Sequence, residues 1–164
     1  MDNRLNIKKL SIYAVLISLT TLATMIITIP IPATKGYINI GDLLVMVSAL
    51  LIGRKGGFVV GGLGSAMADV LLGYGHYAPI TLIVKGIEGW LTGYLYEKSK
   101  TKSTRMPVIV SGLWMATGYF IAEIFLYGKG AIVSLPGNIV QGLACAALAT
   151  VVFPMIERIY KTNA

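Results

Sequence analysis

Five ionisable side chains interrupt segments that are otherwise apolar. They are Asp42, Asp69, Lys85, Glu88 and Glu123. A charge that faced lipid hydrocarbon would cost about 2.5 kcal/mol or more. Each group must therefore face a cavity, a partner or the membrane interface. Asp42 could simply cap the start of a helix, and Lys85 could pair with Glu88 three residues later. Otherwise these charges are suited to holding a polar ligand.

Aromatic and hydrogen-bonding residues gather near the ends of the same segments. They are Tyr37, Asn39, Tyr74, His76, Tyr77, Thr81, Tyr127, Asn138 and Gln141. Tyrosines at these places could serve only as interface anchors, and the two amides could only join neighbouring helices. We favour a ligand for the amides, because Glu123 and Lys85 could converge on them at similar depth. Aromatic walls, amides and a few charges suit a small, planar, polar molecule.

The segments that carry these residues have the length and composition of membrane spans. A helix needs about 20 residues to cross a bilayer. The apolar runs predict six helices, at about Leu10–Ile29, Gly41–Ile52, Gly56–Leu72, Pro79–Tyr96, Met106–Tyr127 and Ser134–Ile156. Pro154 is expected to bend or end the last helix. We therefore expect an all-α, multi-pass bundle that forms a single membrane domain over residues 1–164. The first run exceeds the roughly 7–15 residues of a signal-peptide core, so we interpret it as an uncleaved helix.

Positive charges orient the predicted helices. With six spans, eleven of the 14 Lys and Arg residues lie on the side of both termini, while Lys35 and Lys129 lie opposite and Lys85 lies within a span. Cytoplasmic loops carry the excess of Lys and Arg, so we expect both termini in the cytoplasm. The outward loops are then Thr28–Asn39, Gly73–Ala78 and Gly128–Val133. The basic inner side could also attract anionic lipid headgroups.

Composition excludes several other classes of protein. Hydrophobic residues make up 55% of the chain and charged residues only 13%, against about 25% charged in a typical soluble domain. Mean hydropathy is +0.75. The net charge of +7 is divided among short loops, so we expect no nucleic-acid partner. A lone Cys145 allows no internal disulfide, and a lone His76 no multi-histidine metal site. Because a P-loop motif is absent, we expect no ATP site and no cofactor in this chain.

The carboxylates raise two alternatives to a ligand-binding transport component. Gly41-Asp42 and Asp69 bear a faint similarity to aspartyl intramembrane proteases, but Asn39 stands where the first glycine of that family's Gly-x-Gly-Asp belongs. We therefore expect no enzyme. Buried carboxylates also occur in proton relays. A standalone secondary transporter, driven by protons or sodium, is the alternative function.

The first helix carries a face of small residues. Ala14 and Ser18 stand four apart, so they share one helix face and let another backbone approach closely. Similar pairs in the other helices are expected to serve internal packing. Because the first helix is a long span at the chain end, its small-residue face could serve another subunit.

Several stretches together resemble the substrate-binding S components of energy-coupling factor (ECF) vitamin transporters. They are Tyr37–Asp42, Gly53–Gly57, Gly61–Asp69, Gly73–Pro79 and Lys85-Gly86. The resemblance implies a protein of a prokaryotic plasma membrane that binds a vitamin or its precursor at the outer face. It also implies assembly with a transmembrane coupling subunit and two cytosolic ATPases. Ala14 and Ser18 would dock the coupling subunit, in the position of the family's Ala-x-x-x-Ala. The loop Pro30–Asn39 would close over the ligand.

The ligand is expected to be a hydroxylated heteroaromatic ring. Within the family, the chain looks most like members assigned to pyridoxine-type or hydroxymethylpyrimidine-type ligands, while pantothenate and riboflavin stay open. Tyrosine would stack on such a ring, and amide and charged groups would bind its nitrogen and hydroxyls. The residues expected at the substrate are Tyr37, Asn39, Tyr74, His76, Lys85, Glu88, Glu123, Asn138 and Gln141.

Overall fold

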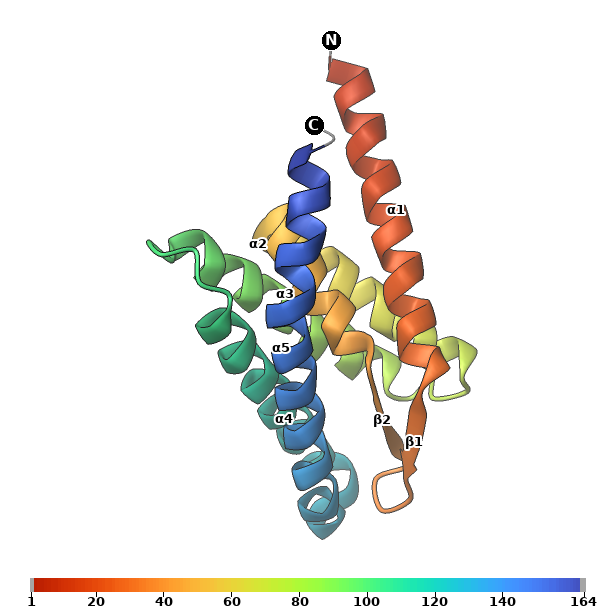
Figure 1. Cartoon of the computed structure of the whole chain (residues 1–164). Helices are drawn as coiled ribbons and strands as arrows, with labels where there is room; N and C mark the ends of the chain where they lie inside the picture. Colours follow the sequence, from red (N-terminus) through yellow and green to blue (C-terminus); the bar gives the residue numbers. More distant parts are fainter. Residues whose placement is uncertain (1, 163–164) are drawn as a thin grey trace.

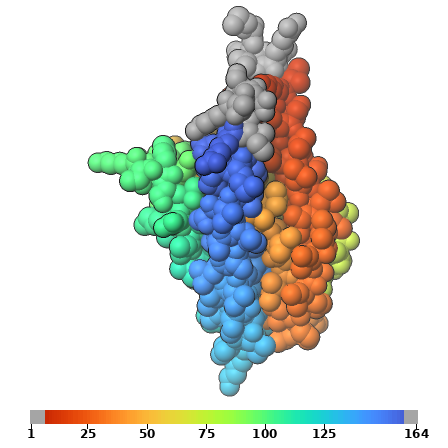
Figure 2. Space-filling model, viewed as in Figure 1, coloured from red at the N-terminus to blue at the C-terminus, as the bar shows by residue number. Residues whose placement is uncertain are grey.

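A computed structural model of the chain describes residues 2–162, with side-chain surroundings for residues 7–158. Its elements are, in order, α1 (Asp2–Ile26), β1 (Thr28–Ile31), β2 (Gly36–Asn39), α2 (Gly41–Leu71), α3 (Ala78–Lys98), α4 (Arg105–Tyr127), the short 3-10 helix η1 (Gly128–Gly130) and α5 (Ala131–Thr162). The start of α1 and the end of α5 lie at one end of the molecule, and the β-hairpin and the α4–α5 turn lie at the other (Figure 1). In the face shown by Figure 2, α5 runs between α4 and the segment formed by α1 and the hairpin.

The second and third predicted helices follow each other directly within α2. Within α2, the backbone leaves helical geometry at Gly53, with φ 78° and ψ 179°. Glycine adopts this positive φ at little cost because it lacks a Cβ. The element α2 thus holds the second and third predicted helices as two helical segments, which meet at a kink at Gly53 instead of being separated by a loop.

Three stretches of the described residues are long and apolar enough to cross a membrane. They are Ile7–Ile26, Gly41–Leu71 and Arg105–Arg158, the last running through α4, η1 and α5. The helix α3 is not one of these three stretches, although it lies in the same bundle. Its middle turns contain the charged residues Lys85 and Glu88.

The all-α prediction misses an antiparallel β-hairpin between α1 and α2. The first helix ends at Ile26, three residues before its predicted end. Ile29 then pairs with Ile38, and Pro30 with Tyr37. β-branched and aromatic residues favour this extended form, and a two-stranded ribbon has only edge strands, which tolerate proline. The loop that was predicted to cover a ligand is therefore an ordered hairpin.

The remaining helix boundaries agree more closely with the predictions. The helix α3 begins one residue before and ends two residues after its predicted range, and α4 differs by one residue at its start. The helix α5 is longer than predicted at both ends, and Pro136 and Pro154 lie inside it. The helix therefore does not end at Pro154. A proline removes one backbone donor, and here the helix continues beyond it.

Glycines bring α2 and α3 into backbone contact. A Cβ added to Gly89 would lie 2.2 Å from the carbonyl oxygen of Gly57, and one added to Gly57 would lie 2.6 Å from that of Gly89. The same arrangement joins α4 and α5, where a Cβ on Gly112 would lie 2.7 Å from the oxygen of Gly142. The small-residue spacing thus serves close helix packing, as expected for these pairs.

Substitution of Gly89 by valine should destabilise the bundle. Overpacking typically costs about 1–3 kcal/mol, and we expect the upper part of that range because the clash involves backbone atoms, which cannot rotate away. Thermal unfolding in detergent would measure it. Gly75→Val is the matched control, since nothing lies within 4 Å of a Cβ at Gly75. Equal unfolding temperatures for the two variants would contradict the close contact.

Candidate functional site

A narrow cavity lies between the hairpin and the helices. It is lined by Thr24, Ile31, Gly36, Tyr37, Asn39, Ser65, Asp69, Tyr77, Thr81, Lys85, Tyr119, Glu123, Asn138 and Gln141. These residues come from the hairpin, from all five helices and from the segment before α3. The cavity volume is about 20 Å³, which is room for about one water molecule. A heteroaromatic ring could therefore enter only if lining side chains moved.

Six of the nine residues predicted at the substrate line this cavity. They are Tyr37, Asn39, Lys85, Glu123, Asn138 and Gln141. The other three lie next to it. Tyr74 packs on Tyr37 with ring centroids 4.7 Å apart, exposed His76 lies 4.9 Å from the ring of Tyr77, and Glu88 is buried beside Lys85. The structure thus brings the predicted residues together, with Tyr74, His76 and Glu88 in surrounding positions.

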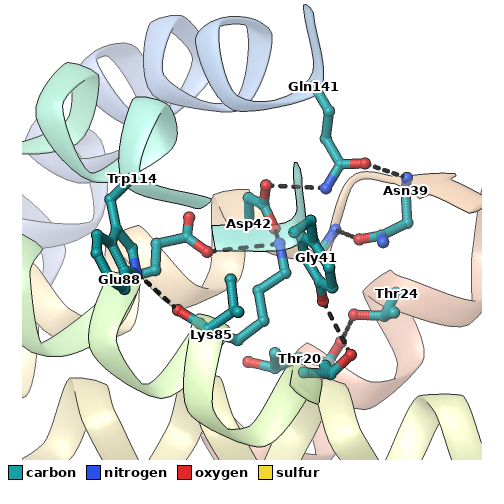
Figure 3. Close-up of polar contacts among 12 residues, drawn as sticks. Thr20, Thr24, Asn39, Gly41, Asp42, Lys85, Glu88, Trp114 and Gln141 are labelled. Carbon is teal, nitrogen blue, oxygen red and sulfur yellow. Dashed lines mark hydrogen bonds and ion pairs between the residues drawn. The ribbon is translucent and has the colours of Figure 1, made fainter. Parts of the chain in front are cut away.

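A buried cluster of charges lies beside the cavity and reaches it through Lys85 (Figure 3). The ammonium of Lys85 donates to Asp42 and lies 3.4 Å from a carboxylate oxygen of Glu88. All three side chains are at most 2% exposed. The predicted pair of Lys85 and Glu88 therefore forms, but Lys85 also pairs with Asp42. Asp42 is not a helix cap: α2 has Ile40 at its N-cap and no side-chain cap hydrogen bond.

Gln141 connects three elements at this cluster (Figure 3). Its Nε2 donates to Asp42 Oδ2 at 2.9 Å, and its Oε1 accepts from the backbone N–H of Asn39 at 2.8 Å. Asn39 Oδ1 in turn accepts from the backbone N–H of Gly41 at 2.8 Å. Gly41 has no room for a side chain, because a Cβ there would lie 2.1 Å from Thr24 Oγ1. The end of β2 and the start of α2 are thereby fixed against α5.

Two tyrosines join the hairpin to the helices. The hydroxyl of Tyr37 donates to Asp69 Oδ1 at 2.6 Å. The hydroxyl of Tyr77 lies 2.8 Å from the carbonyl oxygen of Thr34 and 3.0 Å from Glu123 Oε1. Ser134 Oγ donates to the other Glu123 oxygen. Burial raises the pKa of Tyr37 and that of Tyr77 above the ordinary 10.0. Both phenols therefore keep their protons near neutral pH.

Several polar residues that line the cavity are not among those predicted to contact the substrate. They are Thr24, Ser65, Asp69, Tyr77, Thr81 and Tyr119. Asp42, which is also outside that prediction, contacts Lys85. Asp42 and Asp69 had a signal in the sequence, because they are charges within apolar segments. Ser65 stands four residues before Asp69 on α2, and that spacing could have identified it. Among the described residues, no cluster of three or more His, Cys, Asp or Glu could hold a metal ion.

The small-residue face of α1 is exposed. Ala14 and Ser18 are both exposed, and Ser18 Oγ donates to the carbonyl oxygen of Ala14 at 2.9 Å. Nearer the end of α1 the helix packs on α2, where Thr21 Oγ1 donates to the carbonyl oxygen of Gly64 at 2.8 Å. The face predicted for another subunit is therefore not occupied by this chain's own described residues.

Two curated proteins resemble the chain in sequence. A protein of Pyrococcus woesei described as an uncharacterized protein in gap 3'region is 40% identical over 127 residues, which is 76% of this chain and 84% of that protein. A thiamine precursor transporter, HmpT, of Lactococcus lactis subsp. cremoris (strain MG1363) is 35% identical over 160 residues, covering 96% of this chain and 92% of the transporter.

A solved structure shares the fold. The S component of a bacterial ECF transporter superposes with a TM-score of 0.72 at 22% identity, covering 95% of this chain and 99% of the other. A family model for the S component of ECF-type riboflavin transporters matches residues 4–158. The chain therefore belongs to the ECF S-component family, whose members are membrane-embedded transport proteins and not enzymes.

Proposed function

We propose that this S component captures a single-ring vitamin or vitamin precursor, of the hydroxymethylpyrimidine or pyridoxine type, at the cavity beneath the hairpin. The observation that carries the proposal is the convergence of buried polar groups from distant parts of the chain on one cavity. The kinship with a thiamine precursor transporter over nearly the whole chain favours the hydroxymethylpyrimidine type. The family model that matches the chain describes riboflavin transporters, so riboflavin is the competing candidate ligand.

The cavity offers the groups that such a ring requires. Tyr37, Tyr77 and Tyr119 supply aromatic surface. Asn138 is 5% exposed and lines the cavity, and its amide can both donate and accept hydrogen bonds. A ligand's nitrogen or hydroxyl would bond to it there. A three-ring riboflavin system would displace more of the lining than a single ring, which favours the smaller ligand.

Calorimetry of the purified protein in detergent, without ATP, tests the ligand. Hydroxymethylpyrimidine, pyridoxine and riboflavin would be titrated separately. We expect hydroxymethylpyrimidine to bind most tightly, with one molecule per chain. Tighter binding of riboflavin than of either single-ring compound would contradict the proposed substrate class while leaving the family unchanged.

Energy for transport must come from outside this chain, whose sequence has no P-loop motif. We propose that it works with a transmembrane coupling subunit and two cytosolic ATPases in a prokaryotic plasma membrane, with both termini in the cytoplasm. Uptake by proteoliposomes should then need all the subunits and ATP. Uptake by this chain alone, collapsing with a proton or sodium gradient, would instead support the secondary-transporter alternative.

Bulky substitutions on α1 should block assembly with the coupling subunit. Ala14→Trp and Ser18→Trp place a large ring on the exposed small-residue face, which should keep the partner's backbone away. We expect the co-purified complex to fall at least about tenfold, equivalent to about 1.4 kcal/mol, while vitamin binding is unchanged. Leu19→Trp is the control, since Leu19 is 45% exposed but points away from that face. Equal complex yields for all three variants would refute this docking face.

A further inference from the structure

Two buried polar atoms on α2 lack partners at the cavity. Asp69 is 3% exposed and Ser65 is 2% exposed, and both line the cavity. Neither Asp69 Oδ2 nor Ser65 Oγ has a hydrogen-bond partner among the described residues. The two residues stand four apart and so share one face of the helix. Because buried polar atoms are nearly always paired, these two need an explanation.

The structure fixes the direction of the Asp69 carboxylate. Its Oδ1 accepts the hydroxyl of Tyr37 at 2.6 Å. The ring of Tyr37 is in turn packed on Tyr74, with centroids 4.7 Å apart. The carboxylate therefore cannot turn freely to satisfy Oδ2 elsewhere, and that oxygen remains an acceptor at the cavity wall.

The charge around the cavity is not balanced at Asp69. Among the described residues that line the cavity, Lys85 is the only lysine or arginine, and it pairs with Asp42 and Glu88. The lining also carries Asp69 and Glu123. Acidic groups thus outnumber the basic one at the site, which favours a ligand that brings positive charge or N–H donors.

We propose that Ser65 and Asp69 form a subsite for a nitrogen donor of the ligand. Asp69 Oδ2 accepts an N–H of an exocyclic amino group or of a protonated ring nitrogen, and the Ser65 hydroxyl bonds to the adjoining edge of the ring. The substrate class is then an amino-substituted, protonatable heteroaromatic ring. This inference rests on the proposed function and narrows it. An oxo substituent at the same place would bring an acceptor against a carboxylate, which is repulsive.

A matched pair of ligands tests the subsite. Hydroxymethylpyrimidine carries an exocyclic amino group, and its analogue with oxo in place of amino is the comparison. Calorimetry on the full-length protein should show the amino compound binding about 10- to 100-fold more tightly, the range for a hydrogen bond to a charged group. This comparison requires no variant, so it does not depend on the folding of a mutant.

Three variants then assign the preference to residues. In Asp69→Asn, affinity for the amino compound should fall about 10- to 100-fold while affinity for the oxo analogue stays equal or rises. Ser65→Ala should lower affinity for the amino compound by a smaller factor. Ser48→Ala is the matched control, since Ser48 is also a buried, unpartnered serine of α2 but does not line the cavity. It should change neither affinity.

The outcomes separate the subsite from the proposed function. Equal binding of the amino and oxo compounds by the wild-type protein would overturn the subsite but leave a single-ring ligand in place. A preference for the amino compound that Asp69→Asn leaves intact would also overturn it. Failure to bind either compound or pyridoxine would overturn the proposed function, and the subsite with it.

Discussion

Replacing Lys85 by methionine should lower the free energy of unfolding by about 3–5 kcal/mol, the largest effect that we expect from any single change at the site. The substitution removes the cation that Asp42 and Glu88 share and leaves both carboxylates buried, each at 0% exposed. An uncompensated buried charge costs far more than a lost surface ion pair. Denaturant or thermal unfolding in detergent measures the effect, with tryptophan fluorescence as the signal.

Neutralising the partners should rescue that variant. Lys85→Met combined with Asp42→Asn and Glu88→Gln keeps side-chain size and leaves no charge in the cluster, so most of the lost stability should return. Glu88→Gln alone should cost little, because it leaves Lys85 and Asp42 as a balanced pair. If Lys85→Met unfolds like the wild-type protein, the shared ion cluster does not exist in the folded chain.

Gln141→Met is expected to have the second largest effect, about 2–4 kcal/mol of stability from two lost buried hydrogen bonds. Methionine preserves volume but leaves Asp42 Oδ2 and the backbone N–H of Asn39 without the partner that they have in the structure. Because the second bond holds the end of β2, the hairpin should open more readily. Hydrogen exchange of the hairpin amides should therefore accelerate, and affinity for the proposed ligand should fall.

A neighbouring exposed position provides the control for this variant. Val140 is 67% exposed, so Val140→Met should leave unfolding, exchange and binding unchanged. Unchanged protection of the hairpin amides in Gln141→Met would show that Gln141 does not hold the hairpin.

The parts of the fold that follow from local sequence were predictable. The ends of α3 and α4 fall within one or two residues of prediction, because Pro79 suits the first turn of a helix and charged residues flank both apolar runs. The cavity residues were also largely identifiable. A side chain such as Asn138 or Gln141 inside an apolar helix is costly unless it finds a partner, and that cost points to a shared polar site.

The features that depend on tertiary contacts were not predictable. The residues on both sides of Gly53 are helical, so the sequence alone could not show whether a kink or a loop separates the two helical segments. The hairpin contains Pro30 and Pro32, which indicate a loop in isolation. Lys85 and Glu88 are local neighbours, but Asp42 is 43 residues away from Lys85 and Asn39 is 102 residues away from Gln141. Such pairings arise from helix packing and leave no local pattern.

The central claim is that the cavity's polar groups converge on a bound solute, and Asn138→Leu tests it most directly. This side chain lines the cavity and is 5% exposed, so its replacement by an apolar group of similar volume should leave thermal unfolding unchanged. Native mass spectrometry of the detergent-solubilised protein would count bound hydroxymethylpyrimidine. We predict one molecule per wild-type chain and little or none on the variant. Full occupancy of Asn138→Leu, or an empty wild-type protein, would contradict the account.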